Sequence, residues 1–375
     1  MTAQAFRQSR LAQESSEKRI AFLAISQAHQ FLHWLPVALR LANEPGVHVA
    51  VLVSTRAGAE FIRSYDPGNR LHIKRLWAPS VRRAGLFTPP PRWLALILNA
   101  WSIGRYPTIV TTEITSSLLY RVPGFRSRMV QIKHGAGDRE GGYKRKHARF
   151  DLTLVSGAKD KQRLIERGLA TDQNCIVVGY GKFELVGQMA ESIFADNQPI
   201  ALYNPHFDKK VGTWKRHGKE ILQTMESIPR WNFVVAPHVK LRGGPAVRSN
   251  AGHIVIDRGS TRSIDMSYTQ AASVYIGDAS SQVYEFIRTP RACIFLNLDR
   301  IEWKTDPAYT HWHLGQVIES AGELPAALAR AQTLQSQFEA AQLELSAASI
   351  DHAELPASER QAQAILAFAK SAHAR

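Results

Sequence analysis

The sequence is poor in cysteine, and this limits the kinds of site it can form. Only two cysteines occur among its 375 residues, Cys175 and Cys293, and each stands inside an apolar stretch that reads as a strand. Nothing resembles the paired cysteines of a zinc site. We interpret both as reduced core thiols, which favours a reducing compartment with the cytoplasm as the default.

Long apolar runs are also missing. The longest run with few charges surrounds Trp93–Trp101, which is about half of the ~20 residues that a membrane-spanning helix needs. Residues 1–19 are polar and mixed in charge, without the apolar core of a secretory signal. We therefore expect a cytoplasmic protein without an integral membrane segment.

No Asp-x-Asp motif occurs anywhere in the chain. Many enzymes that transfer groups from nucleotide donors bind a divalent metal on that motif, so its absence favours chemistry with fixed hydrogen-bond donors instead. His311 and His313 stand two apart on one segment, but no third ligand is identifiable. We expect no metal site and no cofactor.

Acidic residues are scarce in the first half of the chain. Residues 1–195 carry 28 Lys and Arg against 14 Asp and Glu, a net charge of +14 out of the total of +15. Residues 70–149 alone carry 16 basic and 3 acidic side chains. A half-molecule with such a field favours an anionic partner, for example a polyanion or anionic lipid head groups.

Short apolar runs alternate with helical patterns along the chain, as in parallel α/β sheets. This predicts two Rossmann-like domains. The expected boundaries are a flexible N-terminus at 1–18, an acceptor-binding domain at 19–190, a nucleotide-donor domain at 191–335, and C-terminal helices at 336–375. The strands are expected at 20–25, 47–53, 107–112, 129–132, 152–155 and 175–178, then at 200–203, 233–236, 253–256, 273–276 and 292–296.

A polar turn follows the predicted strand at 273–276. It contains Asp278, Ser280, Ser281 and Gln282, and Glu285 comes one helical turn later. Backbone N–H groups and hydroxyls that converge at a helix start favour a phosphate, and the glutamate is placed to accept from ribose hydroxyls. Asp and Ser also cap ordinary helices, but one cap does not account for all of these residues.

Two further strand ends carry polar side chains at the same expected edge. His238 follows the strand at 233–236, and Asn204 and His206 follow the strand at 200–203. Ligands of open α/β sheets bind beyond the carboxyl ends of the strands. We predict that these three residues help to bind the nucleotide donor.

A histidine ends the predicted strand at 129–132. His134 is followed by Gly135, which lets the backbone approach a ligand closely. With an ordinary pKa near ~6.5, such a histidine can remove a proton from an acceptor hydroxyl at neutral pH. We predict His134 as the catalytic base.

Other basic residues of the first half are candidates for the acceptor side. His29 and His33 follow the first strand at i and i+4, where a packing role is an equal alternative. Lys144 and Arg145 follow the His134 loop and could bind a phosphate-bearing acceptor, although such runs are usually solvated.

The run from Arg75 to Trp93 mixes basic, aromatic and proline residues, with Arg82 and Arg83 at its centre. One interpretation is a seat on an anionic membrane surface. The equal alternative is a proline-rich loop followed by a core helix at Trp93–Trp101.

Together these motifs resemble the CDP-glycerol glycerophosphotransferase family, the polymer synthases of the teichoic-acid type, from about Gln131 to Leu324. The resemblance implies the GT-B fold, an α/β architecture of two Rossmann-like domains facing a cleft, with C-terminal helices. It also implies that His134-Gly135 supplies the base, that Asp278-Ala279-Ser280-Ser281 with Glu285 grips the donor, and that His238 contacts the donor phosphates. Ala279 stands where the family usually has tyrosine, and His206-Phe207-Asp208 where it has Thr-Trp-Arg.

The expected function is a metal-independent transfer of a glycerophosphate-like or glycosyl group in cell-surface polymer synthesis. The donor would be nucleotide-activated, CDP-linked rather than UDP-linked, and the acceptor anionic or lipid-linked. Peripheral contact with the inner face of the cell membrane would suit such an acceptor. Three alternatives stay open: a UDP-sugar glycosyltransferase, an enzyme like UDP-GlcNAc 2-epimerase, and a non-catalytic polyanion-binding protein. No nucleic-acid-binding motif is present.

Overall fold

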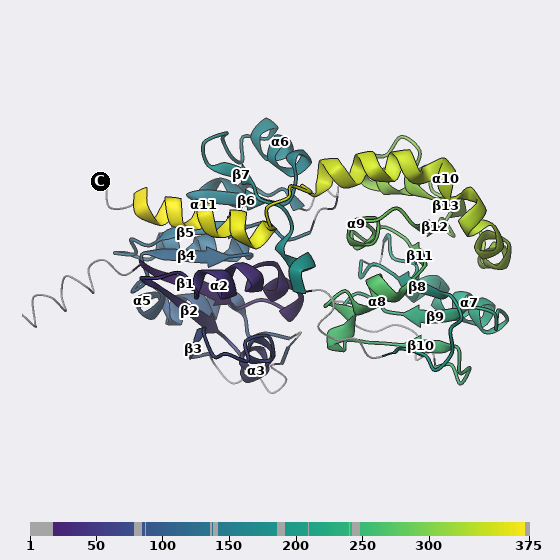
Figure 1. Cartoon of the computed structure of the whole chain (residues 1–375), viewed down its shortest axis with the longest axis horizontal. Helices are drawn as coiled ribbons and strands as arrows, with labels where there is room; N and C mark the ends of the chain where they lie inside the picture. The colour runs from purple at the N-terminus through teal and green to yellow at the C-terminus, as the bar shows by residue number, and fades with distance from the viewer. Residues whose placement is uncertain are drawn as a thin grey trace, which may run out of the picture. The chain divides into compact units, whose positions relative to one another are not determined.

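The chain folds into two α/β units, shown in Figure 1 as a computed structural model. The residues that it describes are 18–78, 85–86, 88–135, 137, 142–185, 192–208, 210–239, 241 and 248–371. Unit 1 contains the described residues up to His134, Lys144–Leu185 and the segment from Asp351 onward. Unit 2 contains the described residues of Gly135–Tyr143 and Val186–Ile350.

A seven-stranded parallel sheet forms the middle of unit 1, in the order β3-β2-β1-β4-β5-β6-β7. Its central strands are aliphatic runs that are buried on both faces, as expected for a parallel sheet covered by helices. The strands are β1 Lys18–Ala24, β2 Val47–Val53, β3 His72–Arg75, β4 Thr108–Thr111, β5 Arg128–Ile132, β6 Leu152–Val155 and β7 Cys175–Val177.

Helices and single 3-10 turns connect these strands. The last helix, α11, returns from the end of the chain to pack on α2, and Figure 1 shows the two side by side. The connections of unit 1 are η1 Ala28–His33, α2 Leu35–Leu41, α3 Arg56–Ser64, α4 Arg92–Leu98, α5 Ala100–Ile103, η2 Ile114–Arg121, η4 Arg145–Arg149, α6 Ala158–Glu166, η5 Gly181–Leu185 and α11 Ala357–Ser371.

Unit 2 is built on a six-stranded parallel sheet in the order β10-β9-β8-β11-β12-β13. The strands are β8 Ile200–Asn204, β9 Asn232–Val235, β10 Ile254–Ile256, β11 Val274–Gly277, β12 Ala292–Leu296 and β13 Gln316–Ile318. The helices are α7 Trp214–Glu226, η6 Thr261–Ser263, α8 Ser267–Ala271, α9 Val283–Phe286, η7 Pro307–Leu314, η8 Ala321–Glu323 and α10 Leu324–Ser349.

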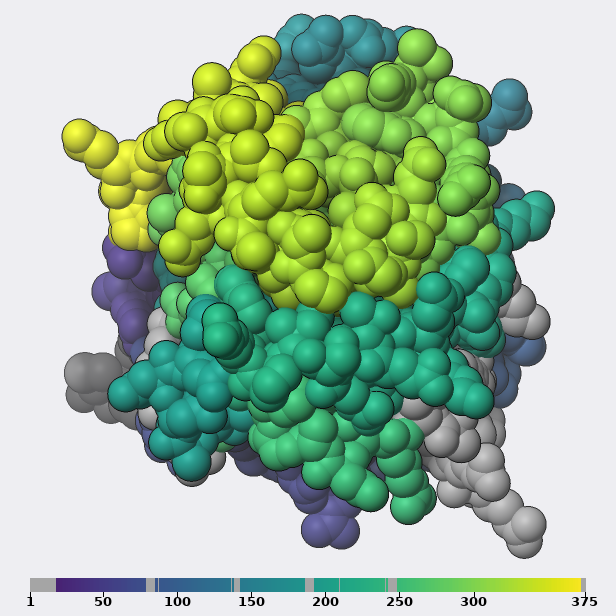
Figure 2. All heavy atoms as spheres, turned by 90° about the vertical axis from the view of Figure 1, so that its right-hand side faces the viewer, coloured from purple at the N-terminus to yellow at the C-terminus, as the bar shows by residue number. Residues whose placement is uncertain are grey.

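Helices α10 and α7 cover one side of unit 2. Figure 2 shows this side, with the yellow-green surface of α10 above the teal surface of α7. Leu324 and Leu328 of α10 share one buried core with Ile221 and Leu222 of α7 and with the strands. Burial of this apolar area is the main force that holds the helices on the sheet.

The α/β class, the two parallel sheets and the C-terminal helices agree with the prediction. All eleven predicted strands are present, with ends that shift by one or two residues. The strands β3 and β13 are not among the eleven: the residues of β3 are mostly exposed and carry no apolar run, and β13 is only three residues long. The predicted segment 1–18 lies outside the described residues except for Lys18, which begins β1. Helix α10 belongs to unit 2 and α11 to unit 1, so the helices at 336–375 do not form one unit.

Each sheet has the same internal order of its first four strands, 3-2-1-4 when each unit is counted separately. The first and fourth strands of a unit are therefore neighbours whose connections leave in opposite directions. Ligands of doubly wound sheets bind at this switch point, beyond the carboxyl ends of the strands. In unit 1 the switch point lies between β1 and β4, and in unit 2 between β8 and β11.

Among the described residues, no helix combines the length and the apolar content that crossing a bilayer would need.

Candidate active site

The switch point of unit 2 is organised by Asp278, which directly follows β11. Its carboxylate accepts hydrogen bonds from the backbone N–H of His206 (2.8 Å) and from the backbone N–H and hydroxyl of Thr213 (2.8 and 2.9 Å). Its own carbonyl accepts from Nε2 of His311 (2.9 Å) and from Nε1 of Trp312 (3.1 Å). The residue therefore ties the loop after β8 and the segment η7 to the end of β11.

This arrangement changes the role that the sequence suggested for Asp278. The side chain is buried, and burial raises its pKa to about 6 despite the hydrogen bonds from Thr213 and His206, which lower it. Its oxygens face protein donors, and a carboxylate would repel a phosphate. Asp278 positions the loop at 206–213, and Thr213 is its partner, which sequence reasoning did not single out.

Ser280 is likewise an interior residue, whereas Ser281 reaches the surface. The hydroxyl of Ser280 donates to Oδ1 of Asn204 (2.9 Å), whose amide donates to the carbonyl of Ala236 (2.6 Å). Ser280 and Asn204 thus join the ends of β11, β8 and β9. Gln282 is half-buried beside the exposed Ser281.

Gly137 approaches the exposed serine closely. A Cβ atom at Gly137 would lie only 2.6 Å from Cβ of Ser281, so no larger residue fits without a shift of the backbone. The glycine-rich segment after His134 therefore meets the turn after β11. Gly135 in the same segment has a φ of +75°, a conformation that favours glycine.

His206 presents a hydrogen-bond donor near the ends of β8 and β9. The backbone N–H of Asp208 donates to its Nδ1 (3.1 Å), so the proton of the neutral ring is on Nε2. The ring of Phe207 lies beside both imidazoles, with ring centroids 4.3 Å from His206 and 4.9 Å from His238. The two histidine rings are 6.1 Å apart, so the structure brings these two predicted donor residues together.

The helix after the polar turn at Asp278–Ser281 is short. The turn was expected to lead into a helix that carries Glu285, and α9 spans only Val283–Phe286. One turn of helix sums few peptide dipoles, so its attraction for a phosphate is weaker than the sequence suggested. Glu285 lies in α9 and is largely buried.

A second acidic turn, at the end of β10, was not singled out from the sequence. Asp257 accepts hydrogen bonds from the backbone of Gly259 (2.9 Å) and Ser260 (2.8 Å), from the Ser260 hydroxyl and from the Tyr268 hydroxyl (2.8 Å). Burial alone would raise the pKa of Asp257, but these hydrogen bonds lower it overall. The signal available in the sequence was an Asp-x-Gly-Ser turn directly after a strand.

The switch point of unit 1 positions His134. Its Nδ1 lies 3.2 Å from the carbonyl oxygen of Thr112, which follows β4. A carbonyl can only accept, so Nδ1 carries the proton and Nε2 of the neutral ring is a proton acceptor. The Thr112 hydroxyl in turn donates to Oε1 of Gln30 (3.1 Å), which follows β1. The ends of β1, β4 and β5 are thereby linked around the histidine.

Two further histidines surround this ring. The ring centroids of His29 and His33 lie 6.5 and 6.0 Å from that of His134. Burial lowers the pKa of His33 well below its usual value, and the charges of Lys182 and His134 lower it further. The ring of Tyr180 lies edge-on to His33 at 5.0 Å. His33 was considered beside His29 from the sequence, with packing as the equal alternative, whereas Tyr180 and the buried Lys182 were not singled out.

The basic residues proposed for the acceptor are at the surface. Lys144 and Arg145, at the start of η4, are both exposed. The same 3-10 turn is anchored by His147, whose Nδ1 lies 2.8 Å from Oε1 of Gln131 in β5. Lys144 and Arg145 are therefore attached to the strand that ends at His134.

Neither a metal centre nor a reactive thiol is found in the described part of the chain. No group of three or more His, Cys, Asp or Glu side chains there could hold a metal ion. His311 donates to the carbonyl of Asp278, and Nε2 of His313 lies 3.1 Å from the carbonyl of Lys304. Both cysteines are buried, and burial raises the pKa of Cys175 to about 11.

The chain shares its fold with solved enzymes of very different sequence. The wall teichoic acid polymerase TagF matches with a TM-score of 0.67 and 12% identity, over 96% of this chain and 92% of that one. UDP-GlcNAc 2-epimerase from Neisseria meningitidis, solved with UDP-GlcNAc bound, matches with 0.62 and 11%, over 96% and 100%. The glycotransferase of kitacinnamycin matches with 0.58 and 11%, over 94% and 99%. These similarities establish the GT-B fold.

No family model matches the sequence, and no curated protein matches it either.

Proposed function

We propose that the chain is a transferase that moves a group from a nucleotide-diphosphate donor to an acceptor hydroxyl, with His134 as the base. The observation that carries the proposal is the contact of His134 Nδ1 with the carbonyl oxygen of Thr112. This contact leaves Nε2 as the proton acceptor, and general-base catalysis requires that tautomer.

In the proposed reaction, the acceptor hydroxyl gives its proton to Nε2 of His134. The acceptor oxygen bonds to the distal phosphorus or the sugar carbon of the donor. The bond from that atom to the oxygen of the leaving nucleotide breaks, and CMP or a nucleoside diphosphate departs. The negative charge on the leaving oxygen needs hydrogen-bond donors, and His206 with Nε2–H and its neighbour His238 would supply them.

For the donor, we propose a CDP-linked compound held by unit 2. Ser281 and Gln282 would contact it beside His206 and His238, and Glu285 would accept from the ribose. Asp278, Ser280 and Asn204 would hold these groups in place without touching the phosphates. The resemblance of the Asp278–Glu285 segment to the glycerophosphotransferases supports this choice, as does the TagF fold, which was also solved after a soak with CDPG.

For the acceptor, we propose an anionic or lipid-linked molecule. The net charge of +14 on residues 1–195 favours an anionic acceptor. Three basic residues lie close, in the chain or in space, to the strand ends of the site: Lys182, Lys144 and Arg145. Synthesis of a cell-surface polymer would use such an acceptor.

The donor is tested by the shift in melting temperature that a panel of CMP, CDP, UMP and UDP produces. The proposal predicts stabilisation by a cytidine nucleotide, because a ligand that binds only the folded chain raises its melting temperature. If none of the four nucleotides raises the melting temperature, the transferase proposal is overturned. A non-catalytic polyanion-binding protein is then favoured. Preference for uridine nucleotides would replace the CDP-linked donor by a UDP-linked one.

The base is tested with His134→Ala. Turnover should fall by about 10²–10⁴-fold while the nucleotide shift stays near that of the wild type. His313→Ala, which changes an exposed histidine of unit 2, is the matched control and should keep its turnover. Lost nucleotide binding with unchanged chemistry would refute the role of His134.

A UDP-GlcNAc 2-epimerase activity is the second candidate, because the fold also matches epimerases solved with UDP-GlcNAc or with UDP. Conversion of UDP-GlcNAc to its C2 epimer without any acceptor would establish that activity. Absence of conversion, together with stabilisation by CMP or CDP, would exclude it.

A further inference from the structure

An apolar surface of unit 1 lies outside the candidate site. We call it the tryptophan face and define it as Trp77, Trp93, Ile97, Leu98 and Trp101. These side chains keep 65%, 57%, 42%, 46% and 89% of their surface exposed. Isolated exposed apolar residues are common, but five on neighbouring segments form the kind of patch that marks an interaction site.

The face is continuous because α4 and α5 follow each other directly. Trp93 and Ile97 are four residues apart and therefore share one side of α4. Trp101 belongs to α5, which begins directly after the break at Asn99. The backbone of Trp77 is held against the junction of the two helices. The backbone N–H of Trp77 donates to Oδ1 of Asn99 (2.9 Å), and the side-chain amide of Asn99 donates to the backbone carbonyl of Trp77 (2.6 Å).

The opposite side of the same helices is core. Leu96, Ala100 and Ile103 pack in the buried cluster of unit 1. One side of 93–101 is therefore core, as one of the two sequence alternatives expected, and the other side is an exposed apolar surface. The membrane seat, the other alternative, stays a prediction. Arg82 and Arg83, which the sequence analysis placed in the membrane seat, lie outside the described residues.

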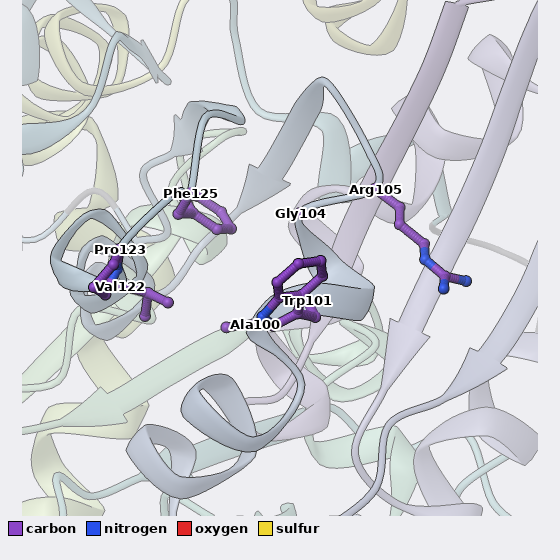
Figure 3. Close-up of a pocket in the computed structure, with 8 residues that line it drawn as sticks. Ala100, Trp101, Gly104, Arg105, Val122, Pro123 and Phe125 are labelled. Atoms are coloured by element: carbon purple, nitrogen blue, oxygen red, sulfur yellow. The ribbon is translucent and has the colours of Figure 1, made fainter.

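A pocket of about 330 Å³ opens beside Trp101. In Figure 3 the indole of Trp101 lies between Phe125 and Arg105, and the guanidinium of Arg105 extends away from Phe125. Its lining residues are Ala100, Trp101, Gly104, Arg105, Val122, Pro123, Gly124 and Phe125. The hollow is thus mostly apolar and has a cation at one side.

The exposed charged residues of the chain stretch that carries most of the face have one sign. Between residues 92 and 128 the exposed charged side chains are Arg105, Arg121 and Arg126, and the last two flank the pocket loop at 122–125. The one acidic residue of this stretch, Glu113, is buried and paired with Arg92 (2.8 Å). The partner of the face must therefore accept tryptophan side chains and supply negative charge.

We propose that the tryptophan face docks on the surface of an anionic lipid bilayer. Tryptophan prefers the head-group level of a membrane, where its ring is buried and its N–H stays hydrated. Arginines at the rim would bind lipid phosphates, and the pocket beside Trp101 would take apolar lipid atoms. A second copy of this chain fits less well, because it would bring two rims of arginine together.

The position of the face connects it to the site of unit 1. Arg92 begins α4 and pairs with Glu113, which follows Thr112 at the carboxyl end of β4. The face therefore starts at the sheet edge that holds His134. A bilayer on this face would present a lipid-linked acceptor to that edge, a consequence that rests on the proposed function, whereas the docking itself does not.

The docking is tested by co-sedimentation with vesicles of phosphatidylcholine, with and without 30% phosphatidylglycerol. Wild-type protein should partition on the anionic vesicles at least tenfold more strongly than on the neutral ones. Trp93→Gln with Trp101→Gln should lose at least tenfold of that partition. The double change Arg105→Gln with Arg126→Gln should also lose about tenfold or more, since each basic residue near the lipid contributes about fivefold.

Matched controls change similar residues elsewhere. Leu343→Gln removes an exposed apolar side chain of α10, and Arg330→Gln removes an exposed arginine of the same helix. Both should bind vesicles as the wild type does. Wild-type binding by the two face variants would overturn the proposal, and so would a change from dimer to monomer by light scattering in these variants.

The nucleotide panel separates this proposal from the proposed function. Variants that lose vesicle binding but keep the nucleotide shift show that docking and donor binding are independent. Vesicle binding that depends on the face, in a protein without any nucleotide shift, would leave the docking in place and remove the transferase.

Discussion

Asp278 illustrates how a single buried group shapes the candidate site. Its two oxygens accept from His206 and Thr213, so it holds the loop that carries the candidate residue His206. The protein tolerates a buried carboxylate here because three donors face it. The cost of burial nevertheless remains visible in its raised pKa.

The raised pKa of Asp278 predicts that the free energy of unfolding depends on pH. The folded-state pKa of Asp278 is about 6, above the value near ~3.9 of an unfolded chain. Between these values the folded chain holds a proton that the unfolded chain has released. The contribution of Asp278 to the free energy of unfolding should therefore fall by about 1 kcal/mol from pH 5 to pH 7.5.

Urea unfolding of the wild type and of Asp278→Asn over that pH range measures the effect. The difference in free energy of unfolding between the two should shrink as the pH rises, because only the wild type titrates. Asp306→Asn, at an exposed turn, should run parallel to the wild type. Parallel curves for Asp278→Asn would contradict the raised pKa.

The sequence predicted the places of the candidate residues in the fold better than their contacts. The candidate residues come directly after strands, and local sequence patterns predict where those strands end. These residues are Asp278, Ser280, His206 and His134. Their roles depend on partners far away in the sequence: Thr213 is 65 residues from Asp278, and Thr112 is 22 residues from His134. No local pattern reports such pairs, so the tautomer of His134 and the interior role of Asp278 needed the structure.

At the scale of elements, burial decided which predictions held. Strands such as β2 and β12 are apolar runs buried along most of their length, and the predicted ranges match theirs. The segment 28–41 is not one continuous helix: η1 ends at His33, and α2 begins at Leu35 with Pro36 in its first turn. Proline is favoured in the first turn of a helix, where no backbone donor is lost.

Helix α10 depends on one buried side chain, which leads to a prediction for stability. The Gln342 amide donates to the carbonyls of Arg291 (2.9 Å) and Leu314 (2.7 Å), and its Oε1 accepts from the N–H of Arg291 (3.0 Å). Gln342→Leu would leave these buried backbone groups without a partner. The free energy of unfolding should fall by about 3 kcal/mol, since each unsatisfied buried group costs ~1–3 kcal/mol.

Chemical denaturation with matched m-values measures this loss. Gln337→Leu is the control, because Gln337 lies on the exposed side of the same helix. It should change the free energy of unfolding by no more than about 0.5 kcal/mol. A small effect of Gln342→Leu would show that its amide does not anchor α10 to the start of β12.

For the whole molecule, the uneven charge is the feature that no single site explains. Residues 1–195 carry +14, and the remaining residues are close to neutral. The candidate acceptor residues lie in this basic part, and so do the arginines around the tryptophan face. The proposed donor-binding residues lie in the near-neutral part. A long-range field therefore acts on an anionic surface or acceptor more than on the donor.

Salt should consequently separate the two kinds of binding. The Debye length falls from about 10 Å at 0.1 M salt to about 3 Å at 1 M, so exposed charges such as Arg105 and Arg126 lose most of their reach. We expect vesicle binding to weaken at least tenfold between 0.1 and 1 M sodium chloride. The nucleotide shift should change far less, because His206 and Glu285, two of the proposed donor contacts, lie in the protein interior, where screening is weak. Equal losses in both measurements would show that the donor is also held mainly by exposed charge. Vesicle binding that resists salt would assign the docking to the tryptophans alone.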